Sequence, residues 1–286
     1  MSSARGKTWR TIDPAWYLIS PLLVLLVLFM VAPVFRIFVL SFFDPDFTLK
    51  HYYKFFQVGV YLDILLRTLT IALIVSLGCL IVGYPMAYLM ADVSPGAAKI
   101  LLVLVVLPMW TGILVRTYAW MVLLGREGLL NRLLIHFGLL SEPLQVLYTS
   151  KAVVLAMVQI MLPLMILPLY AAMKGIDRNL LKASHTLGAG PGRTFWRIFL
   201  PLSVPGIMSG FTLVFIISLA FFITPALLGG PKNITIAMLI EIQVTRLLNW
   251  KFAASISLIL MVMTFIVISL FNKFIGINKL FGSTER

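Results

Sequence analysis

The sequence predicts an all-α, polytopic membrane protein that crosses the bilayer with six transmembrane helices. Of its 286 residues, 61% are hydrophobic and 12% are charged, whereas about 25% of residues are charged in ordinary soluble domains. The apolar residues form blocks of about 20, which is enough for a helix to cross a hydrocarbon core of roughly 30 Å. These blocks lack the alternation of membrane barrel strands, and backbone groups in lipid must be bonded within their own segment, so we expect helices.

Six blocks carry this prediction. In chain order they are residues 17–35, 68–91, 100–115 with an extension to about 124, 152–173, 202–228 and 252–272. The first block follows basic residues, as a signal peptide does. It is too long, however, and no small-residue cleavage site follows it, so we expect it to remain as a membrane anchor. Prolines within or at the ends of the spans are expected to kink the helices and to shape a cavity.

Lysine and arginine predict the orientation of these helices. An even number of spans places both termini on one side, and basic residues are enriched in cytoplasmic loops. With the N-terminus inside, the inner segments carry more basic residues than the outer loops, although Arg36, Arg67 and Arg116 border outer helix ends. We therefore expect residues 1–16 to be a cytoplasmic N-terminal segment. Residues 17–286 are expected to form one transmembrane domain with a cytoplasmic loop at 174–200 and a cytoplasmic C-terminus.

Several classes of function find no support in the sequence. The net charge of +13 suggests nucleic acid, but the basic residues are scattered among loops without an aromatic-basic motif. We therefore assign them to topology and lipid headgroups, and expect no nucleic-acid partner. His51, His136 and His185 are too scattered for a metal site, and Cys79 is the single cysteine. The spans hold no constellation of catalytic side chains, so no catalytic residue and no enzyme activity are expected.

The loop at 174–200 is the most informative stretch outside the predicted spans. Asp177 is placed to cap a short helix over residues 178–187, Gly188 to end it, and Pro191 to start a second helix. At about 100° per residue the first helix has two opposite faces. They are formed by Arg178, Lys182 and His185 on one side and by Ile176, Leu180, Ser184 and Leu187 on the other. Such a segment either lies on the membrane surface or meets a polar partner.

The same loop resembles the EAA loop of ABC-importer permeases. The resemblance is carried by Lys182-Ala183-Ser184-His185-Thr186-Leu187-Gly188-Ala189, by Phe195-Trp196-Arg197-Ile198-Phe199-Leu200-Pro201-Leu202 and by Pro205-Gly206-Ile207. The family pattern is Glu-Ala-Ala, three residues, Gly, and then an apolar Leu-Pro stretch. This chain departs from the pattern at Lys182, where the family has glutamate, and at Ser184. A docking helix is therefore expected, without the salt bridge that the family's glutamate makes.

Further segments resemble the spermidine/putrescine permease branch of that family. They are Gly83-Tyr84-Pro85-Met86-Ala87-Tyr88, Leu107-Pro108-Met109-Trp110 with Arg116, Tyr118 and Trp120, Leu162-Pro163 with Leu167-Pro168-Leu169-Tyr170, Gly229-Gly230-Pro231-Lys232-Asn233, and Asn249-Trp250 with Ala253-Ala254. Together they run from the second predicted helix to the sixth. The resemblance therefore covers most of the chain and implies the type I permease fold of ABC importers.

This resemblance implies a function and a set of partners. In the family, two permease subunits form the pore in the bacterial inner membrane, an ATPase dimer binds the cytoplasmic face, and a periplasmic or extracellular solute-binding protein delivers substrate. This chain would form the translocation path for a polyamine or similar small organic solute, with a second permease subunit in a heterodimer. It has no P-loop, so ATP and Mg belong to the partner ATPase and the chain binds no cofactor itself. The residues implied to couple to the ATPase are Asp177, Leu181, Lys182, Ala183, Ser184, Gly188 and Ala189.

Seven residues are candidates for the substrate pathway, namely Trp110, Arg116, Tyr118, Trp120, Phe221, Phe222 and Glu241. The tryptophans and the tyrosine either attract a cationic substrate through their rings or form an aromatic belt at the interface. Arg116 either lines the pathway or snorkels to the headgroups. The two phenylalanines are either a gate or part of the core, and Glu241 is either a carboxylate for a polyamine or a solvated loop residue.

Two alternatives remain open on the sequence. The chain is a permease for another small solute, or it is a secondary transporter or channel that needs no ATPase. Against the second alternative, no carboxylate lies deep in any predicted span, so the usual relay for protons or sodium is missing.

Overall fold

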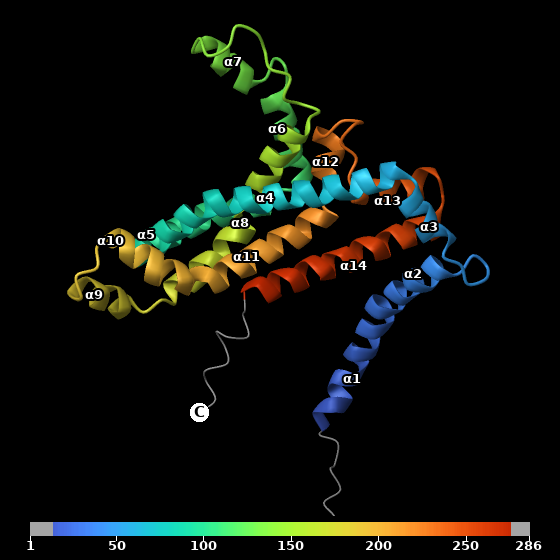
Figure 1. Ribbon diagram of the computed structural model, residues 1–286, viewed down its shortest axis with the longest axis horizontal. Coiled ribbons are helices and arrows are strands. Elements are labelled where there is room, and N and C mark those ends of the chain that lie inside the picture. The colour runs from blue at the N-terminus through green and yellow to red at the C-terminus, as the bar shows by residue number, and fades with distance from the viewer. Residues whose placement is uncertain (1–13, 276–286) are drawn as a thin grey trace, which may run out of the picture.

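The computed structural model describes residues 14–275, without the side chains of residues 14–18, 185, 272, 274 and 275 (Figure 1). All the named elements in this range are helices. Five continuous helices are long and apolar enough to cross a membrane, and a bent pair supplies a sixth span if it counts as one. The expected all-α fold is therefore confirmed, but the third span has a different form.

The five continuous spans agree with the predicted positions. The first, Ile19–Phe42, consists of α1 (Pro14–Leu26), a π-helical turn (Val27–Val31) and α2 (Ala32–Phe42). The second and third are α4 (Gly59–Asp92) and α8 (Ser150–Lys174). The fourth joins α10 (Pro191–Thr194), a π-helical turn (Phe195–Phe199) and α11 (Leu200–Ala220), and the fifth is α14 (Trp250–Ile275).

The helix predicted through residues 100–124 is broken. α5 (Pro95–Val106) continues into a 3-10 turn (Leu107–Trp110), and α6 (Ile113–Leu124) then leaves at a bend of 94°. Pro108 lacks an N–H donor and its ring crowds the preceding turn, which favours a break here. Thr111 is extended, with φ −80° and ψ 137°, and its hydroxyl donates to the carbonyl of Pro108 over 2.7 Å. The prediction of one continuous helix was therefore wrong.

The helix predicted through residues 202–228 is divided as well. α11 ends at Ala220, Phe221 has an extended ψ of 121°, and the short α12 (Ile223–Leu228) follows. Pro225 accounts for the division, because in a continuous helix its ring would clash with the carbonyl of residue 221. Two aromatic side chains, Phe221 and Phe222, consequently occupy a helix break rather than the middle of a span.

The core of the bundle is formed by α4, α8 and α11, which make the most extensive helix contacts in the described chain. Glycines allow this close approach. A Cβ atom at Gly206 in α11 would lie 2.5 Å from the Cβ atom of Ala172 in α8, and one at Gly210 would lie 2.8 Å from Met165 Sδ. The Gly-x-x-x-Gly spacing at the start of α11 therefore lies on the α8 interface.

The shorter elements separate into two ends of the bundle (Figure 1). α9 (Arg178–Thr186) and the junction of α4 with α5 lie at one end, where Arg178 pairs with Asp92. α3 (Lys50–Gln57), α12, α13 (Ile236–Glu241) and the π-helical turn Ile242–Arg246 lie at the other end. α7 (Leu129–His136) follows α6 away from the bundle. Two segments predicted to lie on the cytoplasmic side, the junction of α4 with α5 and the loop at 174–200, thus lie at the same end.

Candidate translocation pathway and coupling surface

α9 has well-defined ends that follow from its sequence. A carboxylate oxygen of Asp177 accepts the backbone N–H of Asn179 over 2.8 Å, so Asp177 is the N-cap. Gly188 has a left-handed φ of +82°, and the N–H of Ala189 donates to the carbonyl of Ser184 over 3.0 Å. This is the Schellman ending that glycine favours after a helix. The short helix expected over residues 178–187 is present as α9.

One face of α9 packs on the membrane domain. Ile176, just before the helix, is buried, and Leu181 packs against the main apolar core. Ser184 is 6% exposed; its hydroxyl donates to the carbonyl of Leu181 over 2.7 Å and is hydrogen-bonded to Thr194 Oγ1 at 2.9 Å. Leu181 therefore holds α9 against the core, and Ser184 holds it against the end of α10.

Much of α9 outside this contact is exposed. Leu180 is 48% and Leu187 is 87% exposed, and Lys182 and Ala183 are also exposed. The sequence placed Leu180, Ser184 and Leu187 on one side of the helix, and of these three only Ser184 is buried. The buried stripe runs through Leu181 and Ser184, where α9 packs against the core and against Thr194.

α9 and the helical segment after α10 also contact α4, which the sequence did not predict. Arg178 Nη1 lies 2.7 Å from Asp92 Oδ1, and its second terminal nitrogen donates to the carbonyl of Ala91. After α10, Phe199 packs edge-on against Tyr88 with ring centroids 4.9 Å apart. Tyr84 Oη is hydrogen-bonded to Ser203 Oγ at 3.0 Å. For the ion pair with Arg178, the sequence offered one signal, the acidic residue Asp92 at the end of a predicted span.

Four of the pathway candidates lie beside the break between α5 and α6: Trp110 just before it, and Arg116, Tyr118 and Trp120 in α6 after it. Trp110 is 87% and Tyr118 is 53% exposed. Trp120 Nε1 donates to Gln159 Oε1 of α8 over 3.2 Å. The Nε atom of Arg116 is buried and has no hydrogen-bond partner among the described residues. Gln159 was missed by the sequence analysis, although an amide inside the apolar fourth span is itself a signal.

The remaining pathway candidates lie on two other elements. α12, which follows Phe221 and Phe222, packs against α6, and Thr117 Oγ1 is hydrogen-bonded to Thr224 Oγ1 at 3.1 Å. Phe221 is partly buried against the core and Phe222 is 36% exposed. Glu241 ends α13, which packs on α14, and its carboxylate accepts from Thr245 Oγ1 over 2.8 Å. The break that carries Phe221 and Phe222 thus lies near α6, because α12 packs on α6. Glu241 lies elsewhere, on α13, which packs mainly on α14.

The described residues contain no group of three or more histidine, cysteine, aspartate or glutamate side chains that could hold a metal ion. The pathway candidates and their hydrogen-bond partners offer aromatic rings, one guanidinium group, one carboxylate, an amide and hydroxyls. Such groups can bind or guide a solute and can transmit movement between helices.

Known proteins resemble this chain over most of its length. A family model described as the binding-protein-dependent transport system inner membrane component matches residues 10–275. The spermidine/putrescine transport system permease protein PotB of Escherichia coli is 36% identical over 243 residues, which is 82% of this chain and 88% of that protein. The protein of the same name from Haemophilus influenzae is 35% identical over 256 residues, covering 87% and 89% of the two chains.

A solved structure has the same fold. A chain of the bacterial alginate ABC transporter, in complex with an alginate pentasaccharide-bound periplasmic protein, superimposes with a TM-score of 0.74 and 20% sequence identity. The match covers 94% of this chain and 96% of that chain. The fold and the comparisons thus agree. The chain has helices long enough to span a membrane and a short helix on the loop between α8 and α10, and the relatives match it over most of their length. This chain belongs to the family of binding-protein-dependent inner membrane transport components, as a multi-pass permease of an ABC importer.

Proposed function

We propose that this permease forms half of the translocation path for a polyamine of the spermidine/putrescine class. The observation that carries the substrate class is the 36% identity to a spermidine/putrescine permease over 82% of the chain. The exposed rings of Trp110 and Tyr118 at the α5–α6 break support it. Aromatic faces attract organic cations by about 0.5–2 kcal/mol each, so several rings can guide a polyamine without binding it tightly.

The same proposal includes three partners. An ATPase dimer binds the exposed face of α9 from the cytoplasm, a second permease subunit completes the pore, and a periplasmic or extracellular binding protein supplies the solute. The ATPase supplies the ATP and Mg chemistry. α9 supports this arrangement because one face is fixed to the bundle by Ser184 while Leu180, Ala183 and Leu187 remain available for contact. Both termini then lie in the cytoplasm of a bacterial cell.

Uptake by the complete importer tests the substrate class. The importer, with its ATPase and second permease, is reconstituted in vesicles that contain ATP, and the binding protein and labelled spermidine are added outside. We expect uptake that requires ATP and the binding protein and that putrescine inhibits more strongly than an amino acid or molybdate. Uptake by the permease without the ATPase would contradict the importer role. ATP-dependent uptake of another solute alone would contradict the polyamine assignment.

Copurification tests the docking face of α9. Leu187→Asp places a charge on a side chain that is 87% exposed, so the chain should still fold. We expect this variant to lose the ATPase during purification. Leu139→Asp is the matched control, because Leu139 is 69% exposed and lies in the loop after α7. Equal recovery of the ATPase with both variants would remove α9 as the docking element.

A further inference from the structure

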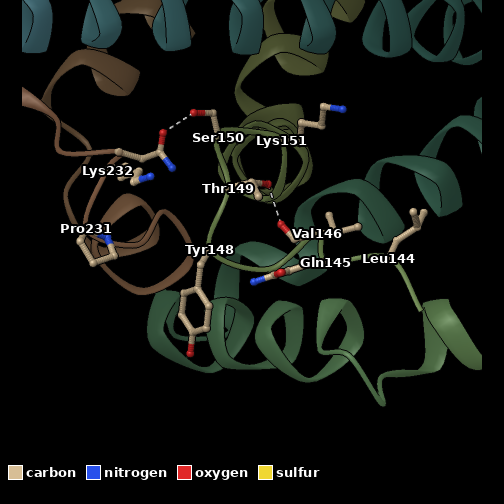
Figure 2. A pocket seen from close by; sticks show the side chains of 10 residues that line it. Leu144, Gln145, Val146, Tyr148, Thr149, Ser150, Lys151, Pro231 and Lys232 are labelled. Atoms are coloured by element: carbon tan, nitrogen blue, oxygen red, sulfur yellow. Dashed lines mark hydrogen bonds between the residues drawn. The ribbon is translucent and has the colours of Figure 1, made fainter. Parts of the chain in front are cut away.

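A hollow lies at the end of the bundle opposite α9. Its volume is about 820 Å³, and it lies between the chain before and at the start of α8 and the turn between α12 and α13 (Figure 2). Its lining residues are Leu144, Gln145, Val146, Tyr148, Thr149, Ser150, Lys151, Pro231, Lys232 and Asn233. α8 runs as one helix from this hollow to the loop that carries α9. If α9 faces the cytoplasm, the hollow faces outward.

Hydrogen bonds fix the two loops that form the hollow. Ser150 Oγ is bonded to Asn233 Oδ1 at 2.5 Å (Figure 2), and Asn233 Nδ2 donates to the carbonyl of Gly229 over 2.5 Å. Arg67 of α4 donates to the carbonyl of Lys232. Two other elements, α8 and α4, and one internal hydrogen bond therefore hold the turn at residues 229–233, so it can receive a partner with little ordering cost.

Backbone geometry adds to this rigidity. Tyr148 and Gly230 both have left-handed φ angles, of 65° and 68°. A Cβ atom at Gly230 would lie 3.0 Å from the Cβ atom of Tyr148, so the two loops touch at this point. Left-handed φ at a tyrosine is uncommon and persists only where its surroundings impose it. Tyr148 nevertheless remains 53% exposed.

The charge of the hollow has one sign. Lys151 and Lys232 are exposed and come from the two different loops, and none of the ten lining residues is acidic. Neither lysine ammonium has a carboxylate within ion-pair distance in the described chain. Two unpaired cations beside an exposed tyrosine match the composition of sites where aromatic anchors and charge complementarity select a protein partner.

We propose that this hollow receives an acidic surface segment of the solute-binding protein, with Lys151 and Lys232 pairing its carboxylates and Tyr148 packing against it. The proposal rests on the importer role proposed above and names where its outer partner docks. A free polyamine does not fit this site, because two lysines repel a polycation.

Charge reversal tests the site in the complete importer. Lys151→Glu and Lys232→Glu are combined, and ATP hydrolysis by the reconstituted importer is titrated with the purified, solute-loaded binding protein of the same system. We expect the concentration for half-maximal stimulation to rise about tenfold or more, since like charges disfavour the encounter, while hydrolysis without binding protein is unchanged. We also expect this concentration to rise with salt in the wild type and less so in the double variant.

Lys50→Glu is the matched control, because Lys50 is exposed at the same end of the bundle but does not line this hollow. An equal loss with Lys50→Glu, or no change in the double variant, would overturn the proposal while stimulation of the wild type persists. If the binding protein does not stimulate ATP hydrolysis by the wild-type importer, the proposed importer role is contradicted, and this proposal, which depends on it, is contradicted as well. Should the double variant fail to assemble, the single neutral changes Lys151→Gln and Lys232→Gln provide the same comparison, with a smaller expected shift.

Discussion

Replacing Gly206 by alanine should separate the two helices that flank the α9 loop. The added Cβ atom would lie 2.5 Å from the Cβ atom of Ala172, 3.1 Å from the carbonyl oxygen of Pro168 and 3.3 Å from the Cα atom of Leu169. Carbon atoms in contact normally lie about 3.5–4.0 Å apart. None of these neighbours can rotate away, so α11 must shift by about 1 Å relative to α8.

The cost of this shift sets the expected magnitude. Overpacking in a close-packed interior destabilises by about 1–3 kcal/mol. For a chain of this size each kcal/mol lowers the melting temperature by roughly 2–4 °C, so we expect a decrease of roughly 2–12 °C. Because α8 and α11 lead into and out of the α9 loop, ATP-driven uptake by the assembled importer should fall as well.

Two further glycines provide a graded comparison. Gly78→Ala meets a γ-methyl group of Val158 at 2.8 Å, which can change its rotamer, whereas Gly96→Ala meets nothing within 4 Å. The melting temperature of the purified importer is measured as the loss of its monodisperse chromatographic peak on heating. We expect this temperature to be lowest for Gly206→Ala, intermediate for Gly78→Ala and highest for Gly96→Ala. If Gly206→Ala melted at the same temperature as Gly96→Ala, the close approach of α8 and α11 would not be a constraint on the fold.

Three further changes have smaller or more local effects. Thr194→Val removes one partner of the hydrogen bond that joins α9 to α10, and should lower the melting temperature by roughly 1–5 °C and reduce uptake per ATP hydrolysed. In a double-mutant cycle, Asp92→Asn and Arg178→Gln should show a coupling of only about 0–1 kcal/mol, because both side chains are about half exposed; a larger value would contradict this reasoning. Lys251 donates a hydrogen bond to Asp44 and holds the pKa of that carboxyl below its ordinary value of 3.8. This hydrogen bond therefore stabilises the fold above pH 3.8, and the stabilisation is lost as the pH falls through the lowered pKa. Melting temperatures measured from pH 6 to pH 3 should therefore fall less steeply for Asp44→Asn than for the wild type.

Much of the fold follows from the sequence because lipid imposes a simple rule. Long apolar blocks must be helices, and five of the six predicted blocks overlap a continuous span, although the block at 202–228 also includes the separate helix α12. Proline was read correctly as a source of bends, but its position alone does not set the angle. At Pro108 the extended Thr111 turns the chain by 94°, whereas Pro85, Pro163 and Pro168 lie inside unbroken helices. Neighbouring helices decide which of these outcomes occurs.

The candidate site was less predictable, since most of its contacts join residues far apart in the chain. Asp177 and Gly188 could be assigned because a capping signal is local. The contacts of Asp92 with Arg178 and of Trp120 with Gln159 depend on tertiary packing. Asp92 and Gln159 stand out as polar residues at or within apolar blocks, but nothing in the local sequence identifies their partners. The helical wheel of α9 shows which side chains share a face, but it could not show that Ser184 is buried while Leu180 and Leu187 are exposed, because that depends on contacts with Thr194 and the core.

Movement of α9 can reach the bundle by two routes of different stiffness. The ion pair between Arg178 and Asp92 is exposed, so a small displacement can break it at little cost. The contact of Ser184 with Thr194, by contrast, is buried, and Thr194 is followed directly by the π-helical turn and α11. Phe199 of that turn packs against Tyr88 of α4. Close-packed interfaces shift as rigid bodies rather than deforming gradually. If the ATPase acts on α9 as proposed above, we expect the force to pass mainly through α10 and α11, and the ion pair with α4 to orient α9 rather than to move the bundle.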